Sequence, residues 1–275
     1  MVAQKSCLFT YLLFLTGGLF AWHLLYLKRS RQAVLYCCTF GGYGLGLLYD
    51  LFNIPRYVSE ANLDDDYVEL HIEKRRHRSP EIAWERCVAE VVFGNILAYT
   101  VLTVMPEGLT KSNIVVYYSV LCILCPLMVA YAVWFVGGIG SQRLDFMQAL
   151  FGSVLTIPLI IRSGPSGIFY AAVSSTIWAN YRGNNLRAME EINLEQKQSY
   201  CTHFLQFFIF VAIIYSCWGC AIYHNAVITT HDGVELPLSE FVANFLKYER
   251  SNCISKIIFY ISILVRKPTK TSSLF

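Results

Sequence analysis

Three ionisable side chains lie inside apolar stretches of this sequence, where a charge is costly and therefore often has a function. They are His23, Asp50 and Glu90. Each lies within a turn or two of the end of its stretch, from where a polar tip reaches the membrane interface at little cost. A contact between His23 and Asp50 requires the two stretches to be offset, and we do not expect it. No chain of acids runs through successive stretches, which argues against a proton-transport pathway.

Ten cysteines offer a second possible chemistry, because two pairs of them have CxxC spacing. Cys122/Cys125 and Cys217/Cys220 both lie inside apolar stretches, where positions i and i+3 share one face of a helix. A zinc site needs four ligands and polar groups around them, whereas a buried free cysteine behaves as a small hydrophobe. We therefore expect these cysteines to pack, and we expect no metal and no cofactor.

Glycines dominate residues 41–46, but a nucleotide-binding loop would need a preceding strand, and none is predicted. Gly42 and Gly46 instead have the GxxxG spacing that lets two helices approach closely, so we predict a helix-packing role for them. The sequence contains no GxSxG, HExxH or P-loop motif. Residues 231–233, His-Asp-Gly, are typical of a tight turn. The sequence therefore predicts a protein that is not an enzyme.

The most distinctive polar stretch is residues 53–86, which we expect to be a polar cytoplasmic loop. Tyr67 and Leu70 fit the YxxΦ pattern that clathrin adaptors bind as an extended peptide. The alternative is an ordinary solvated loop whose basic residues 74–78 contact anionic lipid headgroups.

These side chains must be positioned by membrane helices, because 55% of the residues are hydrophobic, only 15% are charged, and the mean hydropathy is +0.45. A helix needs about 20 apolar residues to cross the hydrocarbon core. We expect a retained first span rather than a cleaved signal, because its apolar run is too long for one. The candidate stretches are residues 7–27, 32–52, 87–105, 114–138, 146–161, 166–180, 203–223 and 253–265.

We therefore predict an all-α polytopic transmembrane bundle of seven or eight spans. Residues 253–265 are short, so they either cross or lie in the interface as an amphipathic helix. Residues 146–161 and 166–180 are short as well, and they form either two spans or a re-entrant pair. The predicted regions are a hairpin domain at 7–52, the polar loop at 53–86, further transmembrane helices at 87–223, and a polar segment with a short apolar helix at 224–275.

The distribution of Lys and Arg predicts the orientation. Eleven of them lie at the N-terminus and in loops 53–86, 139–145 and 181–202, against five on the other side before the tail. The positive-inside rule then places the N-terminus in the cytoplasm. The basic turn at residues 28–31 lies on the other side in this arrangement and argues against it. The net charge of +3 is too small to indicate a nucleic-acid partner.

Several motifs in the first 62 residues resemble the two-transmembrane, or TM2, domain. They are Gly17-Gly18, the run AWHLLYL at residues 21–27, the glycine-rich residues 41–46, and Asp50-Leu51-Phe52. The run IPRYVSEAN at 54–62 is similar to membrane J proteins of DnaJ subfamily C, and residues 137–146 also fit their membrane region. Lys28 stands where these proteins have a glycine.

The resemblance implies recruitment of a DnaK-class chaperone at plasma or endosomal membranes, in clathrin-mediated endocytosis. That activity needs a J domain with a His-Pro-Asp loop, and no His-Pro-Asp occurs in this sequence. The chain stops about where the J domain would follow, so we expect a fragment or a shortened form. We therefore predict a membrane anchor or scaffold, with the lipid bilayer, a DnaK-class chaperone and a clathrin adaptor as partners. The alternative is a small transporter or channel.

Overall fold

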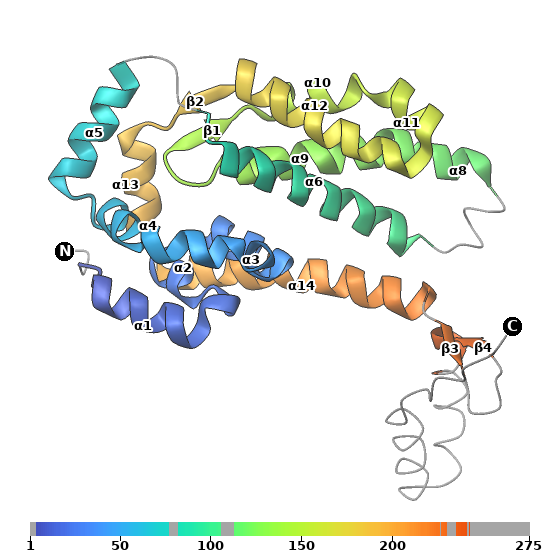
Figure 1. Cartoon of the computed structure of the whole chain (residues 1–275), viewed down its shortest axis with the longest axis horizontal. Coiled ribbons are helices and arrows are strands. Elements are labelled where there is room, and N and C mark those ends of the chain that lie inside the picture. The colour runs from blue at the N-terminus through green and yellow to red at the C-terminus, as the bar shows by residue number, and fades with distance from the viewer. Residues whose placement is uncertain are drawn as a thin grey trace, which may run out of the picture.

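The computed structural model describes residues 4–76, 82–105, 113–225, 227–229, 235–240 and 242, and most of these residues are helical. Figure 1 shows two groups of helices: α6 to α12 lie together, and α1 to α4 lie below them beside α14. The helices are α1 (Cys7–Gly17), η1 (Gly18–Phe20), α2 (Trp22–Tyr26), α3 (Ser30–Tyr43), α4 (Leu45–Asn62), α5 (Asp65–Arg76), α6 (Trp84–Val104), α8 (Ile114–Ser119), η2 (Val120–Leu124), α9 (Cys125–Gly137), α10 (Phe146–Val154), α11 (Ile157–Ser163), η3 (Gly164–Ser166), α12 (Gly167–Arg182), α13 (Met189–Lys197) and α14 (Tyr200–Asn225). The strands are β1 (Gln142–Leu144), β2 (Asn184–Leu186), β3 (Val227–Thr229) and β4 (Glu235–Pro237).

The first apolar stretch does not form one long helix. Helix α1 ends at Gly17, a short 3₁₀ turn follows, and Ala21 takes a left-handed conformation with φ of 57°. Gly17 packs so closely on the Trp22 ring that a Cβ would collide with it. The small residues Gly17 and Gly18 therefore let the chain reverse, and α2 runs back toward the end where α1 began (Figure 1).

The second apolar stretch reverses in the same way. Phe40, Gly41 and Gly42 have positive φ angles of 51°, 70° and 62° inside α3, and Gly44 has φ of 84°. Glycine adopts this left-handed region at little cost, because it has no Cβ. The glycine-rich run thus makes a turn rather than a helix interior, and α4 returns alongside α3.

All four ends of these two hairpins meet at one end of the molecule. The backbone N–H of Lys5 donates to Asn62 Oδ1 at 2.6 Å, and Asn62 Nδ2 donates back to the Lys5 carbonyl at 3.1 Å. Arg29 pairs with Glu60 at 3.3 Å. Residues 5–62, which we call the N-terminal module, therefore fold as two hairpins whose ends lie together.

Helix α4 contains Pro55, which cannot donate the hydrogen bond that the Leu51 carbonyl would otherwise accept. The hydroxyl of Tyr11 in α1 donates to that carbonyl at 3.0 Å. The proline therefore does not break the helix, and the Leu51 carbonyl, which it leaves without a backbone donor, connects α4 to α1 through the Tyr11 hydroxyl.

Residues 53–86, expected to be a loop, are largely helical. Helix α4 continues to Asn62, and α5 follows from Asp65 to Arg76. Helix α5 has Asp65 and Asp66 in its first turn and basic residues in its last turn, an order that complements the helix dipole.

The second group of helices is a packed bundle in which α6 lies against α9 and α12, and α10 lies against α9 and α12. Gly94 and Gly152 face α12, and a Cβ on Gly152 would meet the α12 backbone at 2.8 Å. Strand β1 pairs with β2 antiparallel, with Arg143 opposite Asn185. The segment of α10, α11 and α12 therefore leaves one end of the bundle and returns to it.

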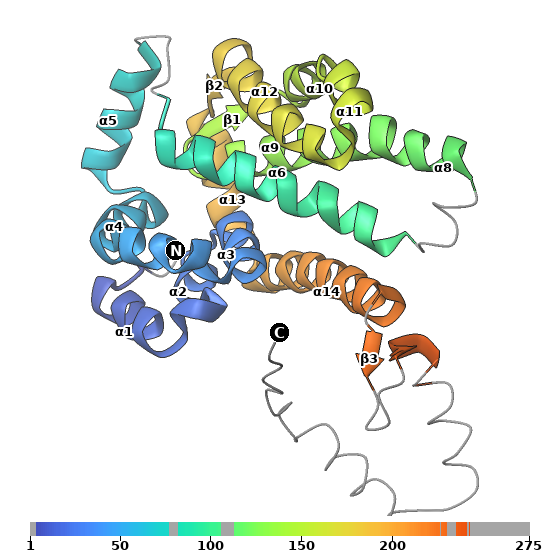
Figure 2. The ribbon, with the colours of Figure 1, turned by 45° about the vertical axis from the view of Figure 1, so that its right-hand side comes forward.

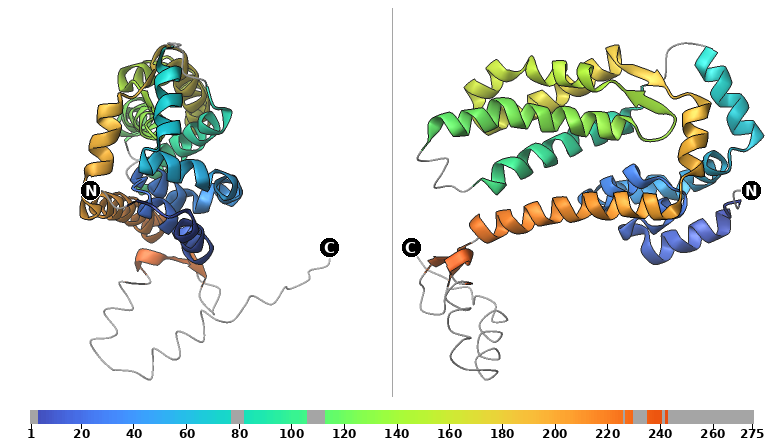
Figure 3. Two further views of the ribbon diagram at one scale, coloured as in Figure 1. Left: turned by 90° about the vertical axis from the view of Figure 1, so that its left-hand side faces the viewer. Right: turned by 180° about the vertical axis from the view of Figure 1, so that it is seen from behind.

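Helix α14 lies on the side of this bundle that faces the N-terminal module, and Figures 2 and 3 show it extending beyond the module. Its Tyr200 hydroxyl donates to the Tyr26 carbonyl at 3.2 Å and its Tyr215 hydroxyl to the Cys37 carbonyl at 3.1 Å. Trp218 Nε1 donates to Thr100 in α6 at 2.8 Å. Helix α14 therefore joins the N-terminal module to the bundle.

The prediction of seven or eight spans is not supported. Within the part of the chain that the structure describes, three helical segments are long and apolar enough to cross a membrane: Trp84–Val104, Ile114–Gly137 and Tyr200–Tyr223. A fourth candidate is the pair Phe146–Val154 and Ile157–Arg182, which bends by 44° and is a broken span or a re-entrant loop. The reason for the difference is length: the 11 residues of α1 cover about 16 Å, roughly half of the hydrocarbon core. Apolar content alone does not reveal where a helix breaks.

The turn at residues 28–31 lies at the same end of the molecule as the N-terminus and the loops around β1 and β2. Lys28 Nζ donates to the Gln196 and Gln198 carbonyls, each at 2.5 Å. Among the residues that the structure describes, Arg162 alone of the Lys and Arg side chains lies at the opposite end, in the last turn of α11. We call the first end the basic end. The objection that this turn raised to the predicted orientation is thereby removed.

Two expectations concern residues outside the described part of the chain: the apolar helix at 253–265 and the turn at 231–233.

Candidate functional site

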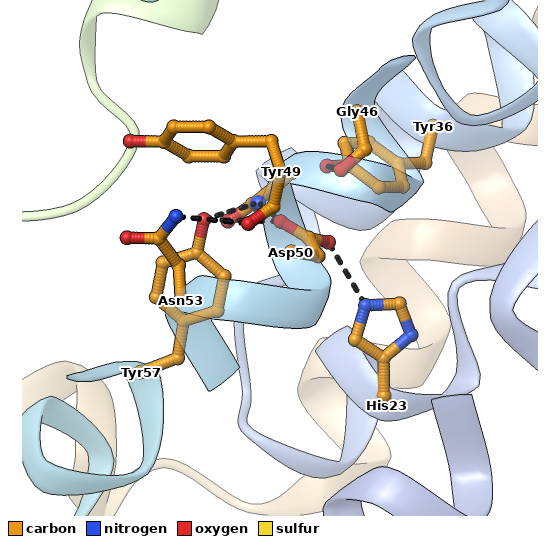
Figure 4. Close-up of polar contacts among 8 residues, drawn as sticks. His23, Tyr36, Gly46, Tyr49, Asp50, Asn53 and Tyr57 are labelled. Atoms are coloured by element: carbon orange, nitrogen blue, oxygen red, sulfur yellow. Dashed lines mark hydrogen bonds and ion pairs between the residues drawn. The ribbon is translucent and has the colours of Figure 1, made fainter. Parts of the chain in front are cut away.

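A buried polar cluster joins the two hairpins of the N-terminal module (Figure 4). His23 Nε2 lies 3.0 Å from Asp50 Oδ2, and both side chains are completely buried. The other carboxylate oxygen, Oδ1, accepts hydrogen bonds from the Tyr57 hydroxyl at 3.0 Å and from Gln32 Nε2 at 3.3 Å. These four side chains, His23, Gln32, Asp50 and Tyr57, form what we call the polar cluster.

Three helices supply the polar cluster. His23 comes from α2, which exists because the chain reverses at Ala21; Gln32 comes from the first turn of α3. Asp50 and Tyr57 lie seven residues apart in α4, which places them two turns apart on one face. Apolar side chains close around them, including the fully buried Leu24 and Ile54.

The chemistry available to the cluster is the sharing of a proton between an imidazole and a carboxylate. A buried carboxylate without partners is strongly unfavourable, and here Asp50 receives three donors. His23 Nδ1 has no hydrogen-bond partner, and the Phe14 ring packs edge-on to the imidazole at 5.1 Å. Among the described residues, no group of three or more His, Cys, Asp or Glu side chains could hold a metal ion. The polar cluster therefore connects α2 to α4 through the contact between His23 and Asp50.

Glu90 belongs to a second buried group, within the bundle. Its Oε1 lies 3.2 Å from Arg86 Nε one turn earlier in α6, and its Oε2 accepts from Asn180 Nδ2 of α12 at 2.7 Å. Arg86 also donates to Asn180 at 2.5 Å and contacts Gln142. Glu90 is fully buried and, like His23 and Asp50, does not snorkel to an interface as expected.

Gly42 and Gly46 do not lie on one helix, because the turn at residues 40–44 separates them. Gly42 is left-handed, and a Cβ on it would meet no atom within 4 Å. Gly46 approaches α3 closely: a Cβ on it would lie 2.9 Å from the Tyr36 hydroxyl, which donates to the Gly46 carbonyl at 2.8 Å. Gly46 therefore has a close-packing role, and Gly42 has a role in the turn.

Tyr67 and Leu70 lie on α5, outside the polar cluster. The Tyr67 ring stacks on His71 at 6.0 Å and is half-buried, while Leu70 is exposed. Burial raises the pKa of the Tyr67 hydroxyl. An adaptor peptide binds in an extended conformation, so α5 would have to unwind to present this motif.

Sequence reasoning missed four partners of the predicted residues: Tyr57 and Gln32 in the polar cluster, and Arg86 and Asn180 beside Glu90. For Tyr57 a signal was present, because a helix running from Asp50 through Pro55 puts positions 50 and 57 on one face. For Gln32 and Asn180 the sequence holds no comparable signal, since their partners come from other helices.

Comparison with known proteins finds a family match at the N-terminus. Residues 3–52 match the TM2 domain family. A TM2 domain-containing protein of Caenorhabditis elegans is 23% identical over 206 residues, which cover 70% of this chain and 48% of the relative. A TM2 domain-containing protein of Dictyostelium discoideum is 42% identical over 65 residues, which cover 24% of this chain and 42% of the relative. No solved structure matches.

The TM2 domain and the apolar helices together define the chain as a membrane protein. The chain spans about half the length of these curated relatives or somewhat less.

Proposed function

We propose that this chain is a non-enzymatic membrane anchor or scaffold in which the N-terminal module and the bundle act as one rigid unit. One observation carries the proposal: His23, Asp50 and Glu90, which lie inside the apolar helices, are fully buried, and each has an ionisable partner. His23 pairs with Asp50, and Glu90 pairs with Arg86.

Burial of this kind favours a scaffold over a transporter. In transporters the charged groups within the membrane face a water-filled cavity or a substrate path. Here Asp50 and Glu90 have no exposed surface, and each already accepts hydrogen bonds from its neighbours. Such groups hold helices in register, which is what a scaffold requires.

We further propose that the basic end is cytoplasmic. The support is the segregation of Lys and Arg among the described residues, which leaves only Arg162 at the other end. In this orientation both re-entrant hairpins enter the membrane from the cytoplasm, and α5 lies on the cytoplasmic side.

The resemblance to membrane J proteins, most closely to DnaJ homolog subfamily C member 22, supports a finer proposal. The scaffold would work beside a DnaK-class chaperone at plasma or endosomal membranes, in clathrin-mediated uptake. The supporting residues are the run at 54–62 and the motifs before it. A second support is the YxxΦ pattern of Tyr67 and Leu70 on the proposed cytoplasmic side. Exchange of Tyr67 for Ala should slow uptake of a surface-labelled copy, and unchanged uptake would remove the adaptor from the proposal.

A small transporter or channel is the competing function, and the re-entrant turn at residues 40–44 favours it. Non-helical backbone at membrane depth occurs in transporters where it lines a cavity. In this structure the turn lies at the surface of the described residues: the Phe40 side chain is exposed, and a Cβ on Gly44 would meet no described atom within 4 Å.

One reconstitution experiment separates the two functions. The full chain in liposomes is tested for proton flux with an entrapped pH dye, alongside Asp50→Asn and the matched surface variant Glu190→Gln, since Glu190 is exposed. We expect no flux above empty liposomes for any of the three. Flux that Asp50→Asn abolishes and Glu190→Gln retains would establish the transporter instead. In the same liposomes we expect no acceleration of ATP hydrolysis by a purified DnaK-class chaperone, and acceleration would contradict the proposed absence of co-chaperone activity.

A further inference from the structure

A half-open cavity of about 30 Å³ lies at the basic end, between the N-terminal module and the bundle. Its walls are the first turn of α3, the residues 138–140 that follow α9, and the region of α13. Four cationic side chains line it, and two carboxylates oppose them. The cations are Lys28, Arg29, Arg31 and Arg187, and the carboxylates are Glu60 and Glu195.

The two carboxylates are already engaged. Glu60 pairs with Arg29 at 3.3 Å, and Glu195 pairs with Arg187 at 2.6 Å. Among the described residues, no carboxylate lies within ion-pair distance of Arg31 or Lys28. The cavity therefore has an excess of positive charge.

Arg31 is held in place by packing rather than by a counter-charge. Its guanidinium lies over the Trp134 ring at 5.2 Å and the Phe135 ring at 5.8 Å. Its Nη1 also rests against Gly138, where a Cβ would collide with it. This glycine lets the guanidinium lie close to the backbone in the wall of the cavity.

Two further donors at the cavity lack partners. Arg29 Nη1 is buried and has no hydrogen-bond partner among the described residues, although Nη2 of the same guanidinium pairs with Glu60. In the described part of the chain, no side chain caps the N-terminus of the 14-residue helix α3, where the first N–H groups have no partner within the helix. A helix N-terminus favours anions because its N–H groups carry partial positive charge.

The electrostatics of the cavity point the same way. Burial lowers the pKa of Lys28 and of Arg31, because withdrawal from water disfavours the charged form of each side chain. A bound anion would supply the missing charge.

We propose that this cavity binds a phosphate group, carried either by an anionic lipid headgroup or by free inorganic phosphate. Phosphate presents several charged oxygens at once, and the planar guanidinium fork of arginine matches that geometry. The donors to the phosphate oxygens would be Arg31, Arg29 and the backbone N–H groups of the first turn of α3. Lys28 would add positive charge to the cavity, and its Nζ is held by hydrogen bonds of 2.5 Å to the Gln196 and Gln198 carbonyls. Since the cavity lies where the helices begin, it is at the level of lipid headgroups in the proposed orientation.

The test uses the full chain in nanodiscs and reads the thermal unfolding midpoint, because a ligand that binds the folded state raises it. In one arm, nanodiscs of phosphatidylcholine are titrated with inorganic phosphate against chloride at equal ionic strength. In the other arm, phosphatidic acid replaces part of the phosphatidylcholine. We expect a rise in at least one arm, and the arm that rises identifies the source of the phosphate. No rise in either arm would overturn the proposal.

Variants then locate the site. Arg31→Gln should weaken binding by about tenfold or more, because it removes charged donors. Gly138→Ala should weaken phosphate binding without any change of charge, since the added methyl group displaces the Arg31 guanidinium. If Arg31→Gln fails to fold, the result for Gly138→Ala decides the question. Lys74→Gln is the matched control, because Lys74 is an exposed cation of α5 at the same end. Binding that survives both pocket variants, or that falls equally in Lys74→Gln, would show diffuse surface attraction and refute the site. These readouts are independent of flux and ATPase activity, so they do not test the proposed function.

Discussion

Exchange of His23 for Leu should destabilise the N-terminal module strongly. The imidazole lies 3.0 Å from Asp50 Oδ2, and neither side chain has exposed surface. Leucine fills similar space but donates nothing, so Asp50 keeps only its bonds from Tyr57 and Gln32. A carboxylate would then be buried without a counter-charge.

Removal of one partner from a buried ion pair typically costs about 3–5 kcal/mol, because the remaining charge is left without compensation. We therefore expect a loss of about 4 kcal/mol.

The assay is the free energy of unfolding in bicelles, measured for wild type and variant at several pH values. Arg143→Gln is the control, because it removes an ion pair with Glu191 at 3.7 Å whose side chains are 63% and 46% exposed. Such a surface pair is worth about 0–1 kcal/mol. A loss in His23→Leu no larger than in this control would refute the idea that the pair ties α2 to α4.

Three further predictions use the same measurement. Tyr11→Phe leaves the Leu51 carbonyl without its donor and should cost about 1–3 kcal/mol; no loss would mean that another donor replaces the hydroxyl. Glu90→Gln leaves Arg86 without its counter-charge inside the bundle and should cost about 3 kcal/mol, whereas a neutral result would show that Arg86 reaches water. Burial lowers the pKa of Lys5 from 10.5 to about 8. Between these two pH values the unfolded state binds more protons than the folded state, so the free energy of unfolding should rise with pH from about 8 to about 10.5. Lys5→Met should abolish that rise, and an unchanged pH profile would contradict the assignment to Lys5.

The basic end shows how the tertiary structure changes the meaning of a sequence signal. Residues 28–31 oppose the predicted orientation as long as residues 7–27 are taken to cross the membrane. Because the stretch reverses at Ala21, Lys5 and Lys28 lie at one end, and both cations contact the Tyr200 ring, at 4.1 Å and 4.9 Å. The basic turn then joins the other basic loops.

Some of the site could be found from sequence and some could not. His23, Asp50 and Glu90 stand out because an ionisable group in an apolar stretch is rare. Their partners do not stand out, since Gln32 and Asn180 are ordinary polar residues until folding places them beside a carboxylate. The pairing of His23 with Asp50 was not expected. It depends on the chain reversals at Ala21 and at residues 40–44, and hydrophobic periodicity does not predict such reversals.

The sequence by itself determined that this is a helical membrane protein whose N-terminal residues match the TM2 domain family. Apolar length and the motifs of the first 52 residues are enough for that, because burial in lipid requires a continuous apolar surface. Only the tertiary structure decided which apolar stretches form helices long enough to cross a membrane. The left-handed residues near Ala21 and Gly42 turn two apolar stretches back on themselves, and left-handed backbone is permitted by glycine but not dictated by it. Contacts between distant segments, including Tyr11 with Leu51 and His23 with Asp50, then make that choice stable.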